Sequence, residues 1–214
     1  MSAGWLDEPV DWPTATWSGR RPATSFTVDP YCYPGTRPDG SYAVSDQEVW
    51  GIDAVDGGWV DRDTGDGIDL ADRALVLAYG SNADPAKLSG RLAGTVFALR
   101  CLVHDHAAVW CNARRHRDRA VVATIEPDPG RIEQHHVLAV TAEQVAEMDR
   151  WEGHPDWYRR DRFAGPVLLE SGAVADDVWA YVGTEARRPV LRIGGRPLPV
   201  AEHCQADVDR LVAR

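Results

Sequence analysis

The feature that most constrains the fold is an apolar run that stops abruptly at small polar residues. Residues 74–79 read ALVLAY, and Gly80, Ser81 and Asn82 follow them directly. A short apolar run that ends at turn residues is typical of a buried strand. Asp84 and Pro85 then predict a helix, with an aspartate N-cap and proline at the first helical position. The sequence therefore predicts a strand, a tight turn and a helix in immediate succession.

Such a turn has two interpretations. Backbone N–H groups at the start of a helix lack intrahelical partners, and with the helix dipole they suit a carboxylate or a developing oxyanion. Taken alone, however, Gly-Ser-Asn is more often structural, because glycine accepts positive φ while serine and asparagine bond their own backbone. A ligand site and a simple turn both remain open on these residues alone.

Composition divides the chain near residue 72. Residues 1–72 combine several tryptophans with many proline, glycine and aspartate residues, and no helical period is sustained there. A segment with this many tryptophans is expected to pack against something. We therefore expect an irregular N-terminal arm of unknown role over residues 1–72, with short strands such as Ser25–Val28 and Glu48–Ile52. The main domain is expected over residues 73–214.

The main domain holds more strands than helices. Thr141 and Gln144 form a capping-box pattern that predicts a helix, and Gly153 is expected to end it. The run from Glu126 to Gly130 predicts a turn between two strands. Further strands are expected near residues 74–79, 95–110, 119–125, 131–140, 158–169 and 178–182. This order predicts an α+β fold, a small, mostly antiparallel β-barrel or sheet with flanking helices.

Composition also narrows the range of partners. A net charge of −10 argues against a broad basic surface for nucleic acid. The four cysteines include no CxxC pair, so a zinc site of that spacing is not expected. The start of the sequence lacks the basic and apolar regions of a signal peptide, and no apolar run is long enough to span a membrane. We expect a cytoplasmic protein without membrane partners, and its oligomeric state stays open.

Three ordered motifs resemble those of the γ-glutamylcyclotransferase (AIG2-like) family. Tyr79-Gly80-Ser81-Asn82 is similar to the YGSN loop of that family. The segment 122–130, VATIEPDPG, is similar to its ATIxPxxG motif, and residues 148–153, MDRWEG, to its LDxxEG motif. The resemblance covers roughly residues 74–205 and none of residues 1–72. Three motifs in the family's order are far more specific than any one of them.

The resemblance implies an activity and a site. It implies an enzyme that converts a γ-glutamyl amide or amine to 5-oxoproline and a free amine, on a small-molecule substrate and without a metal or cofactor. Glu152 takes the position of the catalytic acid/base. The positions expected to bind substrate are Tyr79, Gly80, Ser81, Asn82, Tyr158 and Tyr181.

Elementary chemistry agrees with a carboxylate in that role. The α-amine of the substrate must attack its own γ-carbonyl, yet an amine with a pKa of about 8 is mostly protonated at pH 7. One carboxylate can take the proton from that amine and return it to the departing nitrogen. The alternative for Glu152 is an ordinary glutamate near a helix C-terminus, where the dipole disfavours it.

His135 departs from the family pattern. Gap-free spacing places it where the strand before the catalytic helix usually carries glycine. A bulky ring there is expected to narrow the pocket, to change the substrate or to stop turnover. The alternative function is therefore a non-catalytic ligand-binding or regulatory module on the same fold, with the N-terminal arm plugging the pocket or docking a partner.

Overall fold

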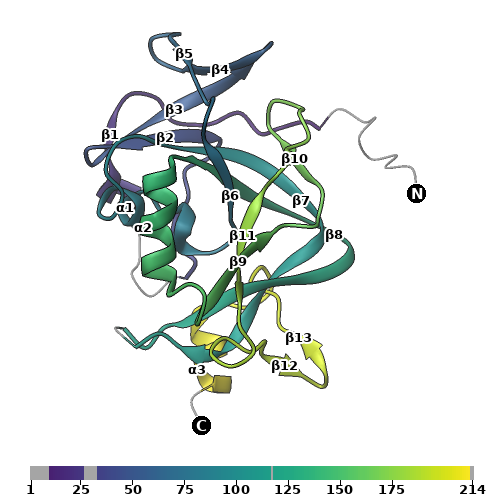
Figure 1. The fold of residues 1–214 in the computed structure, drawn as a ribbon. Helices are drawn as coiled ribbons and strands as arrows, with labels where there is room; N and C mark the ends of the chain where they lie inside the picture. Colours follow the sequence, from purple (N-terminus) through teal and green to yellow (C-terminus); the bar gives the residue numbers. More distant parts are fainter. Residues whose placement is uncertain (1–9, 27–32, 117, 213–214) are drawn as a thin grey trace.

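A computed structural model describes residues 10–26, 33–116 and 118–212. Within them, one eleven-stranded sheet has the main order β5-β4-β3-β2-β7-β8-β6-β11-β9, with β1 beside β3 and β10 beside β7 (Figure 1). A separate hairpin pairs β12 with β13. The strands are β1 (Arg21–Pro22), β2 (Ser41–Ser45), β3 (Glu48–Val55), β4 (Gly58–Asp61), β5 (Gly67–Ile68), β6 (Ala74–Ala78), β7 (Val96–Arg114), β8 (Val121–Val140), β9 (Tyr158–Arg162), β10 (Val167–Leu169), β11 (Trp179–Gly183), β12 (Arg192–Ile193) and β13 (Arg196–Pro197).

The predicted α+β class is confirmed. The sheet is antiparallel throughout the described residues except where β6 and β11 run parallel, and its order has two ends, so it is an open sheet. The helices are η2 (Ala23–Phe26), η3 (Ser81–Ala83), α1 (Pro85–Ser89), α2 (Ala142–Glu152) and α3 (Gln205–Val212). In the described part of the chain, none of them has the length and apolar character to cross a membrane.

Strand β6 lies inside the sheet and is buried on both faces. Val76 and Ala78 belong to one core cluster, whereas Leu77 and the following Tyr79 belong to another. Because alternate side chains of a strand point to opposite faces, a strand covered on both sides is apolar at every position. This explains the continuous apolar run and confirms the predicted strand. The polar residues after Tyr79 therefore emerge at the end of a fully buried element.

Strands β7 and β8 form the long central pair, and the turn predicted between Glu126 and Gly130 is wrong. Strand β8 continues through these residues, with a register shift opposite Asp105. The extra residues are accommodated because Gly130 adopts a φ of 86°, and its N–H donates to Asp105 Oδ1 at 2.8 Å. Proline and glycine residues thus produce a bulge here, and the strand does not reverse.

Helix α2 has the predicted start and end. Thr141 and Gln144 form the reciprocal capping box, and Gly153 ends the helix in the left-handed conformation at a φ of 65°. Met148 of this helix shares a core cluster with Leu88 of α1, so the two helices lie on the same side of the sheet (Figure 1). Glu152 is the last residue of α2 and projects at the helix end.

The N-terminal segment is more regular than its composition suggests. The predicted strand Glu48–Ile52 lies within β3, and β2 pairs with β7 of the main domain. Of the predicted strand Ser25–Val28, the first two residues lie in η2 and the last two fall outside the described residues. Trp50, Ile52 and Trp59 are buried in one core cluster, whereas Val49 belongs to the other, so β3 joins the sheet with both of its faces covered. The domain division at residue 72 stays a prediction.

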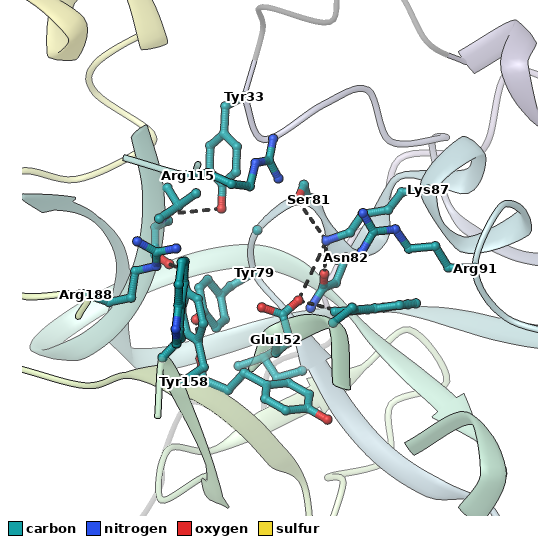
Figure 2. Close-up of a pocket in the computed structure, with 17 residues that line it drawn as sticks. Tyr33, Tyr79, Ser81, Asn82, Lys87, Arg91, Arg115, Glu152, Tyr158 and Arg188 are labelled. Carbon is teal, nitrogen blue, oxygen red and sulfur yellow. Dashed lines mark hydrogen bonds and ion pairs between the residues drawn. The ribbon is translucent and has the colours of Figure 1, made fainter. Parts of the chain in front are cut away.

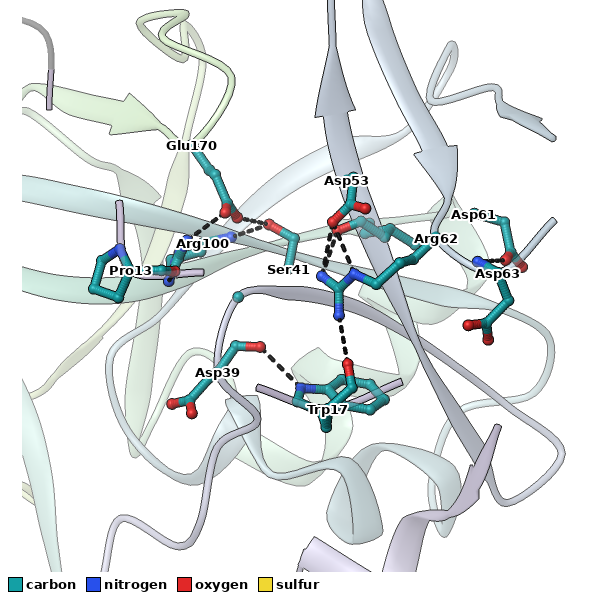
Figure 3. Close-up of polar contacts among 12 residues, drawn as sticks. Pro13, Trp17, Asp39, Ser41, Asp53, Asp61, Arg62, Asp63, Arg100 and Glu170 are labelled. Atoms are coloured by element: carbon teal, nitrogen blue, oxygen red, sulfur yellow. Dashed lines mark hydrogen bonds and ion pairs between the residues drawn. The ribbon is translucent and has the colours of Figure 1, made fainter. Parts of the chain in front are cut away.

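A buried arginine attaches this segment to the main domain (Figure 3). Arg100 of β7 donates to the carbonyl of Pro13 at 2.9 Å and forms an ion pair with Glu170. The hydroxyl of Ser41 donates to the same Glu170 carboxylate at 2.7 Å. Buried polar groups are costly unless they are paired, so these contacts fix the segment on the sheet.

Candidate active site

A cavity of about 110 Å³ opens where β6 ends (Figure 2). Its wall comes from the loop after β6, the end of α2, and the starts of β8 and β9, together with residues before β2 and after β11. All of the site residues expected from the sequence line this one cavity: Tyr79, Gly80, Ser81, Asn82, Glu152, Tyr158 and Tyr181. The structure therefore brings together residues that lie far apart in the sequence.

The loop after β6 lines the cavity and has backbone N–H groups without backbone acceptors. Among the described residues, the N–H groups of Gly80, Ser81 and Asn82 donate to no backbone carbonyl. Gly80 has a φ of −107°, so the positive φ expected from the sequence is not the reason that glycine occupies this position. A Cβ on Gly80 would lie 2.5 Å from the hydroxyl oxygen of Tyr33, and only glycine allows that approach. Because α1 has only five residues, any anion-binding role of this loop would depend on these amides and not on a helix dipole.

Glu152 is partly sheltered at the edge of the cavity, with its side chain 13% exposed. Its Oε1 accepts a hydrogen bond from the indole N–H of Trp151 at 2.7 Å. The same oxygen lies 3.7 Å from the Nζ atom of Lys87. The carboxylate is therefore oriented from two directions while it still faces the cavity.

Lys87, the chain's single lysine, connects Glu152 to the loop. Its Nζ donates to the hydroxyl of Ser81 at 3.1 Å and to the side-chain oxygen of Asn82. Lys87 lies on α1, where Asp84 caps the helix by accepting from the Ala86 N–H at 2.9 Å. The predicted aspartate N-cap thus positions the lysine, whose role in the cavity the sequence analysis missed.

The three expected tyrosines use their hydroxyl protons within the protein. Tyr79 donates to the carbonyl of Tyr181, Tyr158 donates to the carbonyl of Ala123 at 3.0 Å, and Tyr181 donates to Asp149 Oδ1 at 2.7 Å. Burial raises the pKa of all three phenols, so they stay neutral. Their rings therefore shape the wall, and toward a ligand their hydroxyl oxygens can only accept.

Tyr33 is the exception, and it comes from the N-terminal segment. Its hydroxyl oxygen accepts a hydrogen bond from the Ala123 N–H at 3.2 Å, which leaves the hydroxyl proton without an acceptor among the described residues. Burial raises the pKa of Tyr33 to about 12, so the phenol remains a donor at neutral pH. Tyr33 therefore offers the cavity a hydrogen-bond donor beside Gly80.

His135 does not line the cavity, so it does not narrow it. Its Nδ1 accepts from Arg37 at 3.3 Å, because arginine can only donate, and its Nε2 therefore donates to Glu133 at 3.1 Å. Burial lowers the pKa of His135, against the opposing effect of the Glu133 hydrogen bond. Arg37 also donates to the carbonyls of Tyr79 and Gly80 at 2.6 and 3.0 Å. The histidine thus supports the loop from behind.

Comparison with known families shows to which family the chain belongs. A family model described as "Gamma-glutamyl cyclotransferase, AIG2-like" matches residues 76–196, which is more than half of the chain. The chain belongs to this family. A search of curated proteins gives no match.

Several solved structures are similar to the chain at low identity. One is named gamma-glutamyl cyclotransferase, with a TM-score of 0.45 and 19% identity over 52% of this chain and 66% of that one. An uncharacterized protein from Homo sapiens has a TM-score of 0.44 and 21% identity, over 53% and 68%. An AIG2-like protein from Mus musculus has a TM-score of 0.38 and 16% identity, over 52% and 78%. The chain covers just under two thirds of the first structure's length.

The cavity of this γ-glutamyl cyclotransferase family member is strongly cationic. Glu152 is the sole carboxylate among the described residues that line it, against Lys87, Arg91, Arg115 and Arg188. Such a lining favours an anionic ligand. The sequence analysis missed these cations, and Lys87 alone had a local signal, since it follows the Gly80–Asn82 loop on a helix with a predicted cap. Of all the lining residues, Tyr33 alone falls outside the part of the chain that matches the family.

Proposed function

We propose that this chain is a γ-glutamyl cyclotransferase that converts a γ-glutamyl amide or amine to 5-oxoproline and a free amine. The observation that carries the proposal is the position of Glu152 in the same cavity as the amides of residues 80–82, with Lys87 between them. Family membership supports the reaction class. No metal or cofactor takes part in the proposed reaction.

In the proposed reaction the substrate closes on itself. The α-amine of the glutamyl group forms a bond to the γ-carbonyl carbon, and the bond from that carbon to the departing nitrogen breaks. Glu152 takes the proton released by the attacking amine and delivers it to the departing nitrogen, so one carboxylate serves both steps. General acid–base catalysis of this kind typically contributes about 10²- to 10⁴-fold in rate. Holding the glutamyl group of the substrate in the ring-closing conformation accelerates the reaction further.

Charge that develops on the carbonyl oxygen needs fixed donors. The free N–H groups of residues 80–82 provide them on one side, and the hydroxyl of Tyr33 lies beside Gly80. Donors that are already in place when charge develops lower the barrier without reorganising, and one such donor is worth about 10²- to 10³-fold. In this proposal Tyr33 joins the oxyanion site as a donor from outside the family-matched region.

The direct test is product formation. The protein is incubated with a panel of γ-glutamyl amino acids and γ-glutamyl amines, and 5-oxoproline is measured by mass spectrometry. Glu152→Gln keeps the shape of the side chain and is expected to abolish product while the protein stays folded. Glu147→Gln, on the same helix but outside the cavity, is the matched control. Unchanged turnover in Glu152→Gln would refute the assigned role.

The second candidate is a ligand-binding or regulatory module without turnover. Tyr33 favours it, because a side chain of the N-terminal segment enters the cavity beside Gly80. Deletion of residues 1–72 does not test this cleanly, since it removes β2 from the edge of β7. Titration calorimetry with 5-oxoproline and the same γ-glutamyl compounds tests the binding module without removing any part of the sheet. Tight binding with no product from any compound would establish the module in place of the enzyme.

A further inference from the structure

We infer that Arg188 forms a carboxylate-binding subsite for the departing amine, so that the preferred substrates are γ-glutamyl compounds whose amine carries a carboxylate. This inference rests on the proposed function and specifies its substrate class. It assigns a specificity-determining role to a residue that follows β11 and that none of the three sequence motifs contains.

Arg188 is a buried cation with few partners. The residue is only 5% exposed, yet it lines the cavity. Its Nε has no hydrogen-bond partner, and its Nη1 makes only long contacts of 3.4 and 3.3 Å to the carbonyls of Arg114 and Arg187. No described carboxylate forms an ion pair with it. A buried charge without a counter-ion is costly, so a site that keeps one is suited to receive an anion.

The surroundings of Arg188 suit a carboxylate in particular. Its guanidinium lies 4.4 Å from the ring centre of Trp157, which holds the planar group in place. Arg115 lines the same cavity, but Asp118 pairs with it at 2.6 Å and largely neutralises it. On this side of the cavity Arg188 is therefore the one positive charge without a described carboxylate partner, which matches a single carboxylate better than a doubly charged phosphate. Arginine also binds carboxylates with two parallel hydrogen bonds.

Position assigns this carboxylate to the departing amine. Lys87 and Arg91 lie on one side of the cavity and Arg188 on the other, with Glu152 between them (Figure 2). In the proposed reaction the bond that breaks must face Glu152, and the amides of residues 80–82 take the glutamyl carbonyl oxygen. Those amides belong to the loop that Lys87 contacts through Ser81, so the glutamyl group is placed on that side. The remaining side, between Trp157, Tyr158 and Arg188, is left for the amine.

The test uses two compounds that differ in a single charge: γ-glutamyl-L-alanine and γ-glutamyl-L-alaninamide. The wild-type protein is expected to show a kcat/KM for the acid about 10- to 100-fold above that for the amide, which is the range for a hydrogen bond to a charged group. Equal values for the two compounds would overturn the subsite and would leave the proposed function standing. This arm needs no variant, so it does not depend on how a substitution folds.

Variants then assign the preference to Arg188. In Arg188→Gln the ratio of the two kcat/KM values is expected to fall close to one, and Arg188→Lys is expected to retain part of it. Arg187→Gln, at the exposed neighbouring position, should keep the full ratio. A ratio that persists in Arg188→Gln would overturn the assignment. Thermal melting confirms that each variant is folded.

Binding measurements separate this inference from the proposed function. Calorimetry with Glu152→Gln protein measures the affinity for the same two compounds without turnover. If the wild type forms no 5-oxoproline but the acid still binds more tightly through Arg188, the reaction is refuted and the subsite stands. If both compounds bind equally, the subsite is refuted whether or not product forms.

Discussion

Lys87 and Glu152 form an ion pair in the wall of the cavity, with the Nζ of the lysine 3.7 Å from Oε1 of the glutamate. The same ammonium donates to Ser81 at 3.1 Å. One side chain therefore sets the position of the proposed acid/base relative to the loop that carries the amide donors. Their separation is controlled by α1, which the Asp84 cap fixes at the end of β6.

Replacing Lys87 by methionine is expected to lower kcat by about 10- to 100-fold, the range for losing a hydrogen bond to a charged group. Methionine keeps most of the aliphatic stem but removes the charge, which also lies 5.4 Å from the ring centre of Trp151. The kcat of Lys87→Arg should lie between those of the wild type and Lys87→Met, because arginine keeps the charge with a different geometry. Steady-state kinetics with one γ-glutamyl compound measure both. A methionine variant with the kcat of the wild type would show that the lysine does not orient Glu152.

Tyr33→Phe is expected to lower kcat by about 10-fold or more, because its hydroxyl proton is the one left for the ligand. It should also cost about 1 kcal/mol of stability, because the Ala123 N–H loses its acceptor. Tyr158→Phe makes the matched comparison. Its hydroxyl donates to the Ala123 carbonyl, so its loss should cost about 1 kcal/mol of stability. The two variants should therefore lose similar stability in urea unfolding, and initial rates distinguish them by the larger loss of kcat in Tyr33→Phe. Equal effects of both variants on kcat would argue against an oxyanion role for Tyr33.

Gly80→Ala tests the close approach of Tyr33 to the loop. Alanine accepts a φ of −107°, so the cost arises from its Cβ, which would lie 2.5 Å from the tyrosine hydroxyl oxygen. A forced contact of this kind typically costs about 1–3 kcal/mol. In Tyr33→Phe protein the nearest ring carbon is 3.5 Å away, and the same substitution should cost little. A double-mutant cycle measures the coupling, and simple additivity would contradict the geometry.

The buried His136 is expected to make the folded protein less stable at acidic pH. It is buried and contacts the Gly40 carbonyl at 3.0 Å, and burial lowers its pKa from 6.5 to about 3. Between these values the unfolded chain binds the proton and the folded protein does not. The free energy of unfolding must therefore fall as the pH drops below about 6.5, by up to about 1.4 kcal/mol per pH unit.

Urea unfolding between pH 4.5 and 6.5 measures this slope. His136→Gln is expected to reduce it by about one proton. The exposed His116 is the control, and His116→Gln should leave the slope unchanged. An identical slope in His136→Gln and wild-type protein would show that another group controls the acid transition.

Local chemistry explains what could be predicted from the sequence. The buried strand before Gly80, the Asp84 cap and the capping box at Thr141 depend on residues within four positions of each other, and all three are confirmed. The turn at Glu126–Gly130 was wrong for a long-range reason: whether proline and glycine reverse a strand or bulge it depends on a partner such as Asp105.

The candidate site could likewise be predicted only where its residues belong to local sequence patterns. Seven lining residues were found because they belong to, or follow, recognisable motifs, although their roles stay proposals. Tyr33 and Arg188 had no such signal, since each reaches the cavity through contacts with residues distant in the sequence. Nor does sequence spacing show that His135 lies outside the wall, behind the loop.

The attachment of β2 to the edge of β7 has an evolutionary consequence. The stretch before β2 lies outside the family match, and among its described residues Tyr33 is the one that lines the cavity. Evolutionary change at Tyr33 can therefore alter this wall of the cavity, and with it the range of compounds admitted, without any substitution in the family-matched residues that form the rest of the wall.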